Sequence, residues 1–153
     1  MNKEIQHPVL GIDHGEARIG LAITDPVGIM AHPLETIQLK TTDPIERIIN
    51  LIKERKIKQI VLGLPLRMDG SEGTAAEKIR AFGIEIMEKI DLPLHYVDES
   101  LTTVVAAEKL HQAGKNAKKQ KSIIDQAAAV EILSNWLDQL APLDQDSPDT
   151  SSF

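Results

Sequence analysis

Two short apolar runs near the start of the chain, separated by a glycine-containing turn, constrain the fold most. The first run extends from Val9 to Ile12 and the second from Ile19 to Ile23. Apolar runs of this length, bounded by turn residues, are typical of β-strands, and two in succession predict a hairpin. Asp13 comes directly after the first run. Because a carboxylate at the end of a buried strand is costly without compensation, Asp13 either accepts hydrogen bonds from the turn or binds a cation.

The rest of the chain alternates predicted helices and strands. We expect an edge strand over 34–39 and two further strands over 57–64 and 92–97. Helices are predicted to begin after the N-cap Asp43, at Thr74 with Glu77 completing a capping box, at Thr102 and at Ser122. This order predicts an α/β fold, a mixed five-stranded sheet with helices on both faces.

Length and composition indicate one globular domain. The 153 residues are 42% hydrophobic and 26% charged, and the absence of cysteine excludes disulfides and thiolate zinc sites. The sequence offers neither a membrane-spanning apolar segment nor a signal-peptide core, so we expect a cytoplasmic protein with no membrane partner. We expect the domain to comprise residues 1–140, followed by a disordered acidic tail, 141–153, rich in Pro, Ser and Asp.

The charge of the chain leaves the class of partner open. A net charge of −6 argues mildly against a sequence-independent nucleic-acid binder, although three of the acidic residues belong to the expected tail. Five lysines gather in one short stretch: Lys109, Lys115, Lys118, Lys119 and Lys121. Such a run is either a solvated face or a surface that contacts phosphates.

Carboxylates follow two predicted strands and lie in the first turn of the last predicted helix. Asp98 and Glu99 end a strand that we expect beside the one ending in Asp13, and Asp125 follows Ser122. Grouped carboxylates repel one another unless a cation neutralises them, and hard divalent cations prefer oxygen ligands. Candidate ligands of Mg²⁺ or Mn²⁺ are therefore Asp13, Asp98, Glu99 and Asp125. Two such ions, about 3.5–4 Å apart, would suit phosphodiester hydrolysis.

Each acid also has a purely structural interpretation. Asp125 could be the capping-box acid of a helix that begins at Ser122, where the helix dipole favours it. Asp98 could accept hydrogen bonds from the threonines that follow it. The five histidines show no spacing typical of metal ligands, and His14 is expected to be a turn residue rather than a base.

Four segments carry short motifs in a fixed order: DHGEARIGLA (13–22), GLP with DGS (63–65 and 69–71), DESLTT (98–103) and DQAAAV (125–130). Together they resemble the YqgF/RuvX family of Holliday-junction resolvases and pre-16S rRNA processing nucleases. The resemblance extends from Leu10 to about Leu140, and it implies an RNase H-like fold. Two positions depart from the family pattern, since Ser100 replaces the usual Arg and Ala17 replaces the commoner Lys.

The resemblance implies a metal-dependent nuclease that processes the 5′ end of pre-16S rRNA in ribosome biogenesis, with pre-ribosomal particles as partners. It implies that Asp13, Glu99 and Asp125 are the catalytic acids, with Asp98 beside Glu99. Asp13 would bridge two Mg²⁺ or Mn²⁺ ions, while Glu99 and Asp125 each hold one side. Residues expected to hold backbone phosphates are Arg18, Lys115, Lys118, Lys119 and Lys121.

Other functions remain open from the sequence. A Holliday-junction resolvase acting on structured DNA would need a dimer, and we expect a monomer or a weak homodimer. Ser122 stands where RuvC-type resolvases tend to carry a further acid, which favours rRNA processing over junction resolution. A non-catalytic RNA-binding module is a further alternative. Similar aspartate-glycine turns bind ATP in actin-like and sugar-kinase folds, but those proteins use two such domains.

Overall fold

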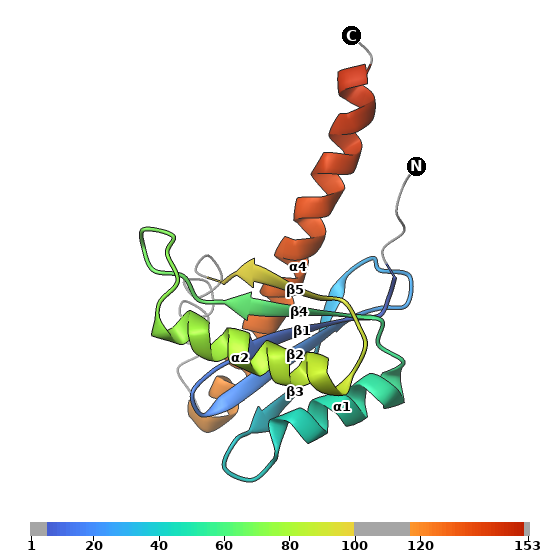
Figure 1. Ribbon diagram of the computed structural model, residues 1–153. Helices are drawn as coiled ribbons and strands as arrows, with labels where there is room; N and C mark the ends of the chain where they lie inside the picture. Colours follow the sequence, from blue (N-terminus) through green and yellow to red (C-terminus); the bar gives the residue numbers. More distant parts are fainter. Residues whose placement is uncertain (1–5, 100–116, 152–153) are drawn as a thin grey trace.

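Five strands form one mixed sheet in the order β3-β2-β1-β4-β5 (Figure 1). β1 pairs antiparallel with β2 and parallel with β4, and β4 pairs parallel with β5. The strands are β1 (Val9–His14), β2 (Arg18–Thr24), β3 (Ala31–Gln38), β4 (Gln59–Leu64) and β5 (Leu94–Asp98). The computed structural model describes residues 6–99 and the backbone of 117–151, with side chains described over 6–99 and 122–140. The mixed five-stranded sheet confirms the prediction.

Helices cover both faces of the sheet, as predicted. α1 (Pro44–Arg55) and α2 (Thr74–Lys89) lie on one face, and α4 (Ala117–Ser151) crosses the other (Figure 1). Leu10 and Ile12 belong to the apolar cluster under α1 and α2, whereas Val9 belongs to the cluster under α4. Successive side chains of a strand point to opposite faces. The odd-numbered residues of β1 therefore face α4.

The start of α1 matches the sequence prediction. Asp43 is the N-cap, and its carboxylate accepts hydrogen bonds from the backbone N–H groups of Ile45 and Glu46 at 3.1 and 3.4 Å. Pro44 takes the first helical position, where its missing N–H is not needed. The C-cap after Arg55 is Lys56, whose φ of 55° lies in the left-handed region. Local capping chemistry thus sets both ends of α1.

The predicted cap of α2 at Thr74 is wrong. The N-cap is Gly73, which makes no side-chain cap hydrogen bond, and Thr74 is the first helical residue. The preceding loop is ordered by Asp69, whose carboxylate accepts from the N–H and hydroxyl groups of Ser71 at 2.9 and 2.6 Å. The guanidinium of the exposed Arg67 side chain packs against Gly73, with Nε 2.6 Å from the position that a Cβ of residue 73 would take.

α4 begins at Ala117, five residues before the predicted start at Ser122. Its backbone continues past Leu140 and covers most of the segment 141–153 that we expect to be disordered. The division into a domain and a tail stays a prediction. The helix predicted over 102–114 lies outside the described residues. Within the described part, none of the helices combines the length and apolar character needed to cross a membrane.

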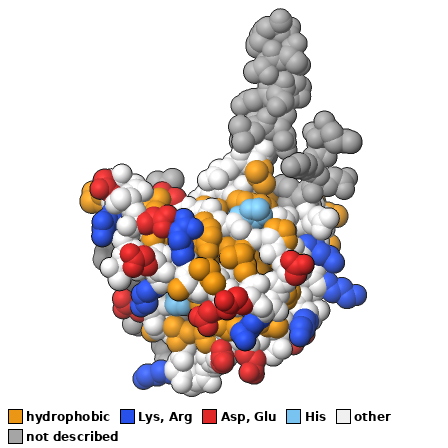
Figure 2. Space-filling model, in the orientation of Figure 1, with side chains coloured by type: hydrophobic (Ala, Val, Ile, Leu, Met, Phe, Trp, Pro, Cys, Tyr) orange, Lys and Arg blue, Asp and Glu red, His pale blue; other side chains and the backbone are white. Residues whose placement is uncertain are grey.

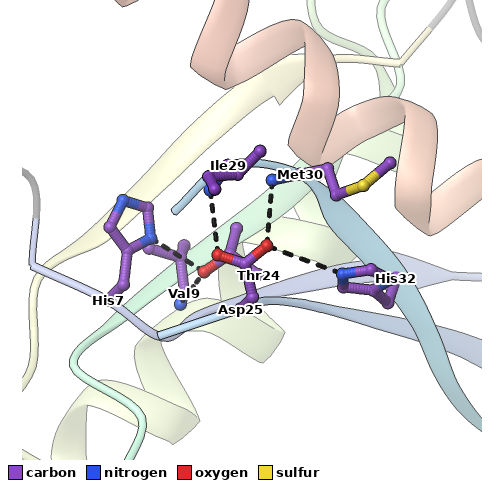
Figure 3. Close-up of polar contacts among 7 residues, drawn as sticks. All are labelled: His7, Val9, Thr24, Asp25, Ile29, Met30 and His32. Carbon is purple, nitrogen blue, oxygen red and sulfur yellow. Dashed lines mark hydrogen bonds and ion pairs between the residues drawn. The ribbon is translucent and has the colours of Figure 1, made fainter. Parts of the chain in front are cut away.

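A polar network fixes the turn that follows β2, at the sheet edge opposite the end of β1 (Figure 3). Thr24 is 2% exposed, and its Oγ1 accepts from Val9 N–H and lies 2.8 Å from His7 Nδ1. The Asp25 carboxylate accepts from Ile29 N–H and Met30 N–H and lies 3.6 Å from His32 Nε2.. These bonds hold the turn without involving Asp13.

On the face shown in Figure 2, acidic and basic side chains are interspersed around a central apolar area.

The capping of α1 gives a first testable prediction. Asp43→Ala leaves two N–H groups of the first turn without their carboxylate acceptor, so the free energy of unfolding should fall by about 1 kcal/mol. Urea denaturation measures this change. Asp91→Asn, at an exposed position between α2 and β5, is the control and should change stability by less than about 0.5 kcal/mol. Equal stability of Asp43→Ala and the parent would contradict the cap.

Candidate active site

Two carboxyl groups meet at the carboxyl ends of the parallel strands, on the face covered by α4. Asp13 is the fifth residue of β1 and pairs with Gly20 of β2. Glu99 follows β5, and its N–H donates to the Leu64 carbonyl at 3.2 Å, which continues the β4–β5 ladder. The side chains of Asp13 and Glu99 are hydrogen-bonded to each other. The sequence prediction that these two acids converge agrees with this contact.

The predicted adjacency of the two strands is wrong, because β4 lies between β1 and β5. Gly63 of β4 makes the contact possible. A Cβ at residue 63 would lie 3.3 Å from the Glu99 Cβ and would collide with Ile132 of α4. A residue without a side chain therefore leaves room for Glu99 and Ile132 above the middle strand. Gly inside a strand is a recognised sign of such a close approach.

Burial and the shared hydrogen bond perturb both acids. Burial raises the pKa of Asp13, with a smaller contribution from the negative charge of Asp125, while the Glu99 hydrogen bond lowers it. Burial, the Asp13 hydrogen bond and the charges of Asp13 and Asp98 raise the pKa of Glu99 to about 9. We infer that Glu99 carries the shared proton at neutral pH. Ionisation of both carboxyl groups of a desolvated, hydrogen-bonded pair is unfavourable without a compensating positive charge.

Asp98 lies on the opposite side of the sheet from the Asp13–Glu99 pair. It pairs in register with Leu64, and Leu64 belongs to the apolar cluster under α1 and α2. Val97, one residue earlier, packs in the cluster under α4. Asp98 is exposed, and its charge reaches Glu99 through space. Strand alternation thus favours Glu99 over Asp98 as the partner of Asp13.

Asp125 reaches the same edge from α4 and forms an ion pair with Arg18 of β2. Arg18 Nε lies 2.7 Å from Asp125 Oδ2, with both side chains about one-quarter exposed. Thr36 of β3 holds the surrounding turn of α4, because its hydroxyl donates to the Ser122 carbonyl and accepts from the Gln126 side chain. Since α4 begins at Ala117, Asp125 lies in the helix interior. The alternative of a helix-capping Asp125 is therefore wrong.

Gly20 allows α4 to approach β2 closely enough to place Asp125. A Cβ at residue 20 would fall on the carbonyl oxygen of Asp125, and Gly11 on the neighbouring strand is also tight, with Ala129 and Leu133 3.1 Å from its Cβ position. Sequence analysis missed this role, although glycines inside two predicted strands were visible. It also missed the ion pair, because no local pattern links residues 18 and 125.

Within residues 6–99 and 122–140, no three carboxylate and imidazole groups are grouped closely enough to form a ready-made metal site. Asp13 is the acid that interacts with both Glu99 and Asp125, but the carboxylate of Asp125 accepts a hydrogen bond from Arg18.

Of the residues predicted to contact phosphates, only Arg18 has a described side chain. Lys115, Ser100 and the threonines after it lie outside the described residues, as do the side chains of Lys118, Lys119 and Lys121.

Comparison with known proteins identifies the family. A family model described as RuvX, Holliday junction resolvase, matches residues 7–139. The chain belongs to the RuvX family. It is 44% identical over 133 residues to a Cutibacterium acnes protein named "Putative pre-16S rRNA nuclease", covering 86% of this chain and 82% of the relative. A Lactobacillus gasseri protein of the same name is 44% identical over 135 residues, covering 85% and 94%.

Solved structures support the fold of this RuvX-family chain. Thermus thermophilus RuvC in complex with a Holliday junction substrate superposes with a TM-score of 0.54 at 16% identity, covering 87% of this chain and 95% of RuvC. The yeast mitochondrial Holliday junction resolvase Ydc2 gives a TM-score of 0.54 at 14% identity, covering 92% and 83%. The predicted RNase H-like architecture is confirmed.

The raised pKa of Glu99 gives a prediction about stability. Between the ordinary carboxyl pKa of about 4.3 and a pKa of about 9, folded Glu99 holds a proton that the unfolded chain has released. The contribution of Glu99 to stability is therefore full at low pH and is lost as the pH rises through this window. Urea unfolding in EDTA should show the parent losing stability relative to Glu99→Gln from pH 5 to pH 9. A constant difference between the two would contradict the buried acid pair.

The close approach of α4 gives a second prediction. Gly20→Ala places a methyl group on a backbone oxygen, so it should cost at least about 3 kcal/mol, at the upper end for overpacking. Gly11→Ala, with 3.1 Å contacts, should cost about 1–3 kcal/mol. Urea denaturation of both variants tests the order. A Gly20→Ala protein as stable as the parent would show that α4 does not lie where the structure places it.

Proposed function

We propose that this chain is a metal-dependent nuclease that hydrolyses phosphodiester bonds, acting on the 5′ end of pre-16S rRNA in pre-ribosomal particles. The observation that carries the proposal is the hydrogen-bonded Asp13–Glu99 pair at the sheet edge, where the negative charge of Asp125 also acts on Asp13. Membership of the RuvX family and the names of its relatives support the reaction class and the substrate.

The donor set suits a hard divalent cation. Asp13 and Glu99 are half-buried oxygen donors whose pKa values are raised, chiefly by burial, so ionisation of both is unfavourable in the protein alone. Mg²⁺ or Mn²⁺ would supply a compensating positive charge. Because Asp13 interacts with both other acids, we propose that Asp13 would be the central ligand of such a site and that Glu99 and Asp125 would be its further ligands. Bound metal ions lower the pKa of the attacking water and stabilise the leaving oxygen.

Arg18 has a part in this proposal that sequence analysis did not assign. Its Nε donates to Asp125, so a cation already neutralises that carboxylate in the protein alone. If Asp125 were a ligand of a metal ion, the guanidinium would be available for a substrate phosphate, which is the role predicted for Arg18. Asp13 and Glu99 would bind such an ion as carboxylates, and the bonds of Thr36 hold the turn of α4 that carries Asp125. Hydrolysis would leave a 5′-phosphate and a 3′-hydroxyl.

Holliday-junction resolution is a second candidate, because the family model carries that description. The same acids would cut DNA strands, and two copies of the chain would be needed to cut both strands of a junction. Cleavage assays with matched single-stranded RNA, single-stranded DNA and four-way junctions, each with Mn²⁺ or EDTA, separate the candidates. No cleavage of any substrate would leave an RNA-binding module.

The catalytic assignment is tested by charge removal. Asp13→Asn and Asp125→Asn keep the side-chain shape but remove the negative charge, so each should lower the cleavage rate by more than about 100-fold, the upper cost of losing a residue that only supports a metal ligand. Asp138→Asn, at an exposed position on α4, is the matched control and should cut at the parental rate. Circular dichroism checks that all three fold. Full activity of Asp13→Asn would overturn the proposed function.

A further inference from the structure

A surface pocket adjoins the acid pair and is not explained by the carboxylates alone. It has a volume of about 470 Å³ and lies between the β1–β2 turn, Pro65 after β4 and the first two turns of α2. We call it the α2 pocket and define it by six of its lining residues: His14, Pro65, Thr74, Lys78, Ile79 and Glu99. Glu99 belongs both to its wall and to the pair with Asp13. A ligand in the pocket therefore contacts the candidate active site.

Three lining residues of the α2 pocket offer apolar or aromatic surface, and two of them are packed against the protein interior. Ile79 is 4% exposed and packs in the core under α1 and α2. The His14 ring is held edge-on against Phe82 of α2, with ring centroids 4.5 Å apart and an interplanar angle of 77°. Pro65 is the third of these residues, with a ring of fixed conformation. A flat ring system bound here would meet preordered apolar surfaces.

The exposed lining residues of the α2 pocket are polar, with opposite charges on α2 and on the β1–β2 turn. Thr74 and Lys78 are exposed on α2, whereas Glu16, also part of the lining, is exposed on the β1–β2 turn. An anionic group is therefore favoured beside Lys78 and repelled from the turn. The volume falls within the range of about 300–1,000 Å³ of pockets that take small organic ligands. One aromatic ring with an attached anion matches these features.

We propose that the α2 pocket binds one unpaired nucleotide of the RNA strand that is cut, with its base against His14, Pro65 and Ile79 and its phosphate on Lys78. The inference rests on the proposed function and deepens it by naming the substrate class. A base inside a duplex is paired and stacked, so it enters such a pocket only from a single-stranded or extruded position. The enzyme thus selects RNA that is unpaired beside the scissile phosphate.

Binding measurements in EDTA test the α2 pocket separately from cleavage. A fluorescent single-stranded RNA decamer and the same strand in a duplex are titrated with the full chain, followed by fluorescence anisotropy. Lys78→Gln should weaken binding of the single strand about tenfold, as expected for one charge-assisted contact, and lower its log–log salt slope by about 0.7. Ala75→Phe, at an exposed lining position, should fill the pocket and weaken single-strand binding as well. Duplex binding should not change.

Lys89→Gln, at the other end of α2, is the matched charge control and should bind as the parent does. If both Lys78→Gln and Ala75→Phe bind single-stranded RNA with the parental affinity and salt slope, the α2 pocket does not bind a nucleotide. This result would leave Asp13-dependent cleavage unaffected. Equal weakening of single-stranded and duplex RNA would also overturn the pocket proposal, because a general loss of phosphate attraction explains that result. Pocket-dependent binding without cleavage by the parent would instead overturn the proposed function alone.

Discussion

The hydrogen bond between the Asp13 and Glu99 carboxyl groups is the interaction on which the candidate site depends. It joins two strands that are not neighbours, since β4 lies between them, and it does so above Gly63. Burial makes the second negative charge unfavourable, so the protein alone keeps a proton on Glu99. A divalent cation could take the place of this proton, which is why we propose metal-dependent chemistry for the site.

The same constraint explains how α4 and β2 contribute. Asp125 would add a third negative charge to the edge, and the Arg18 guanidinium compensates it at 2.7 Å. Gly20 permits the close approach of α4, and Thr36 fixes the surrounding helical turn. In the protein alone, the charge of Asp125 is thus compensated by a side chain of the chain itself. Among the described residues, Asp13, Glu99 and Asp125 do not form a ready-made three-ligand site.

Much of the fold could be predicted from the sequence because its determinants are local. The β1–β2 hairpin follows from two apolar runs and a glycine-containing turn, and Asp43 with Pro44 marks the start of α1. The order of β4 and β5 could not be predicted, since strand order depends on contacts far apart in the chain. The predicted start of α4 was wrong because serine is a typical N-cap residue, whereas Ser122 lies inside the helix.

For the site, the sequence named candidate acids but not their arrangement. Asp98 and Glu99 point to opposite sides of the sheet, and only the register of β5 with β4 shows which of the two lies on the side of Asp13.

Titration calorimetry of Mn²⁺ into the parent, Asp13→Asn and Asp138→Asn tests the central claim most directly. We expect saturable binding by the parent and by Asp138→Asn, and its loss in Asp13→Asn. No saturable binding by the parent, or equal binding by Asp13→Asn, would contradict a metal ion held by the Asp13–Glu99 pair.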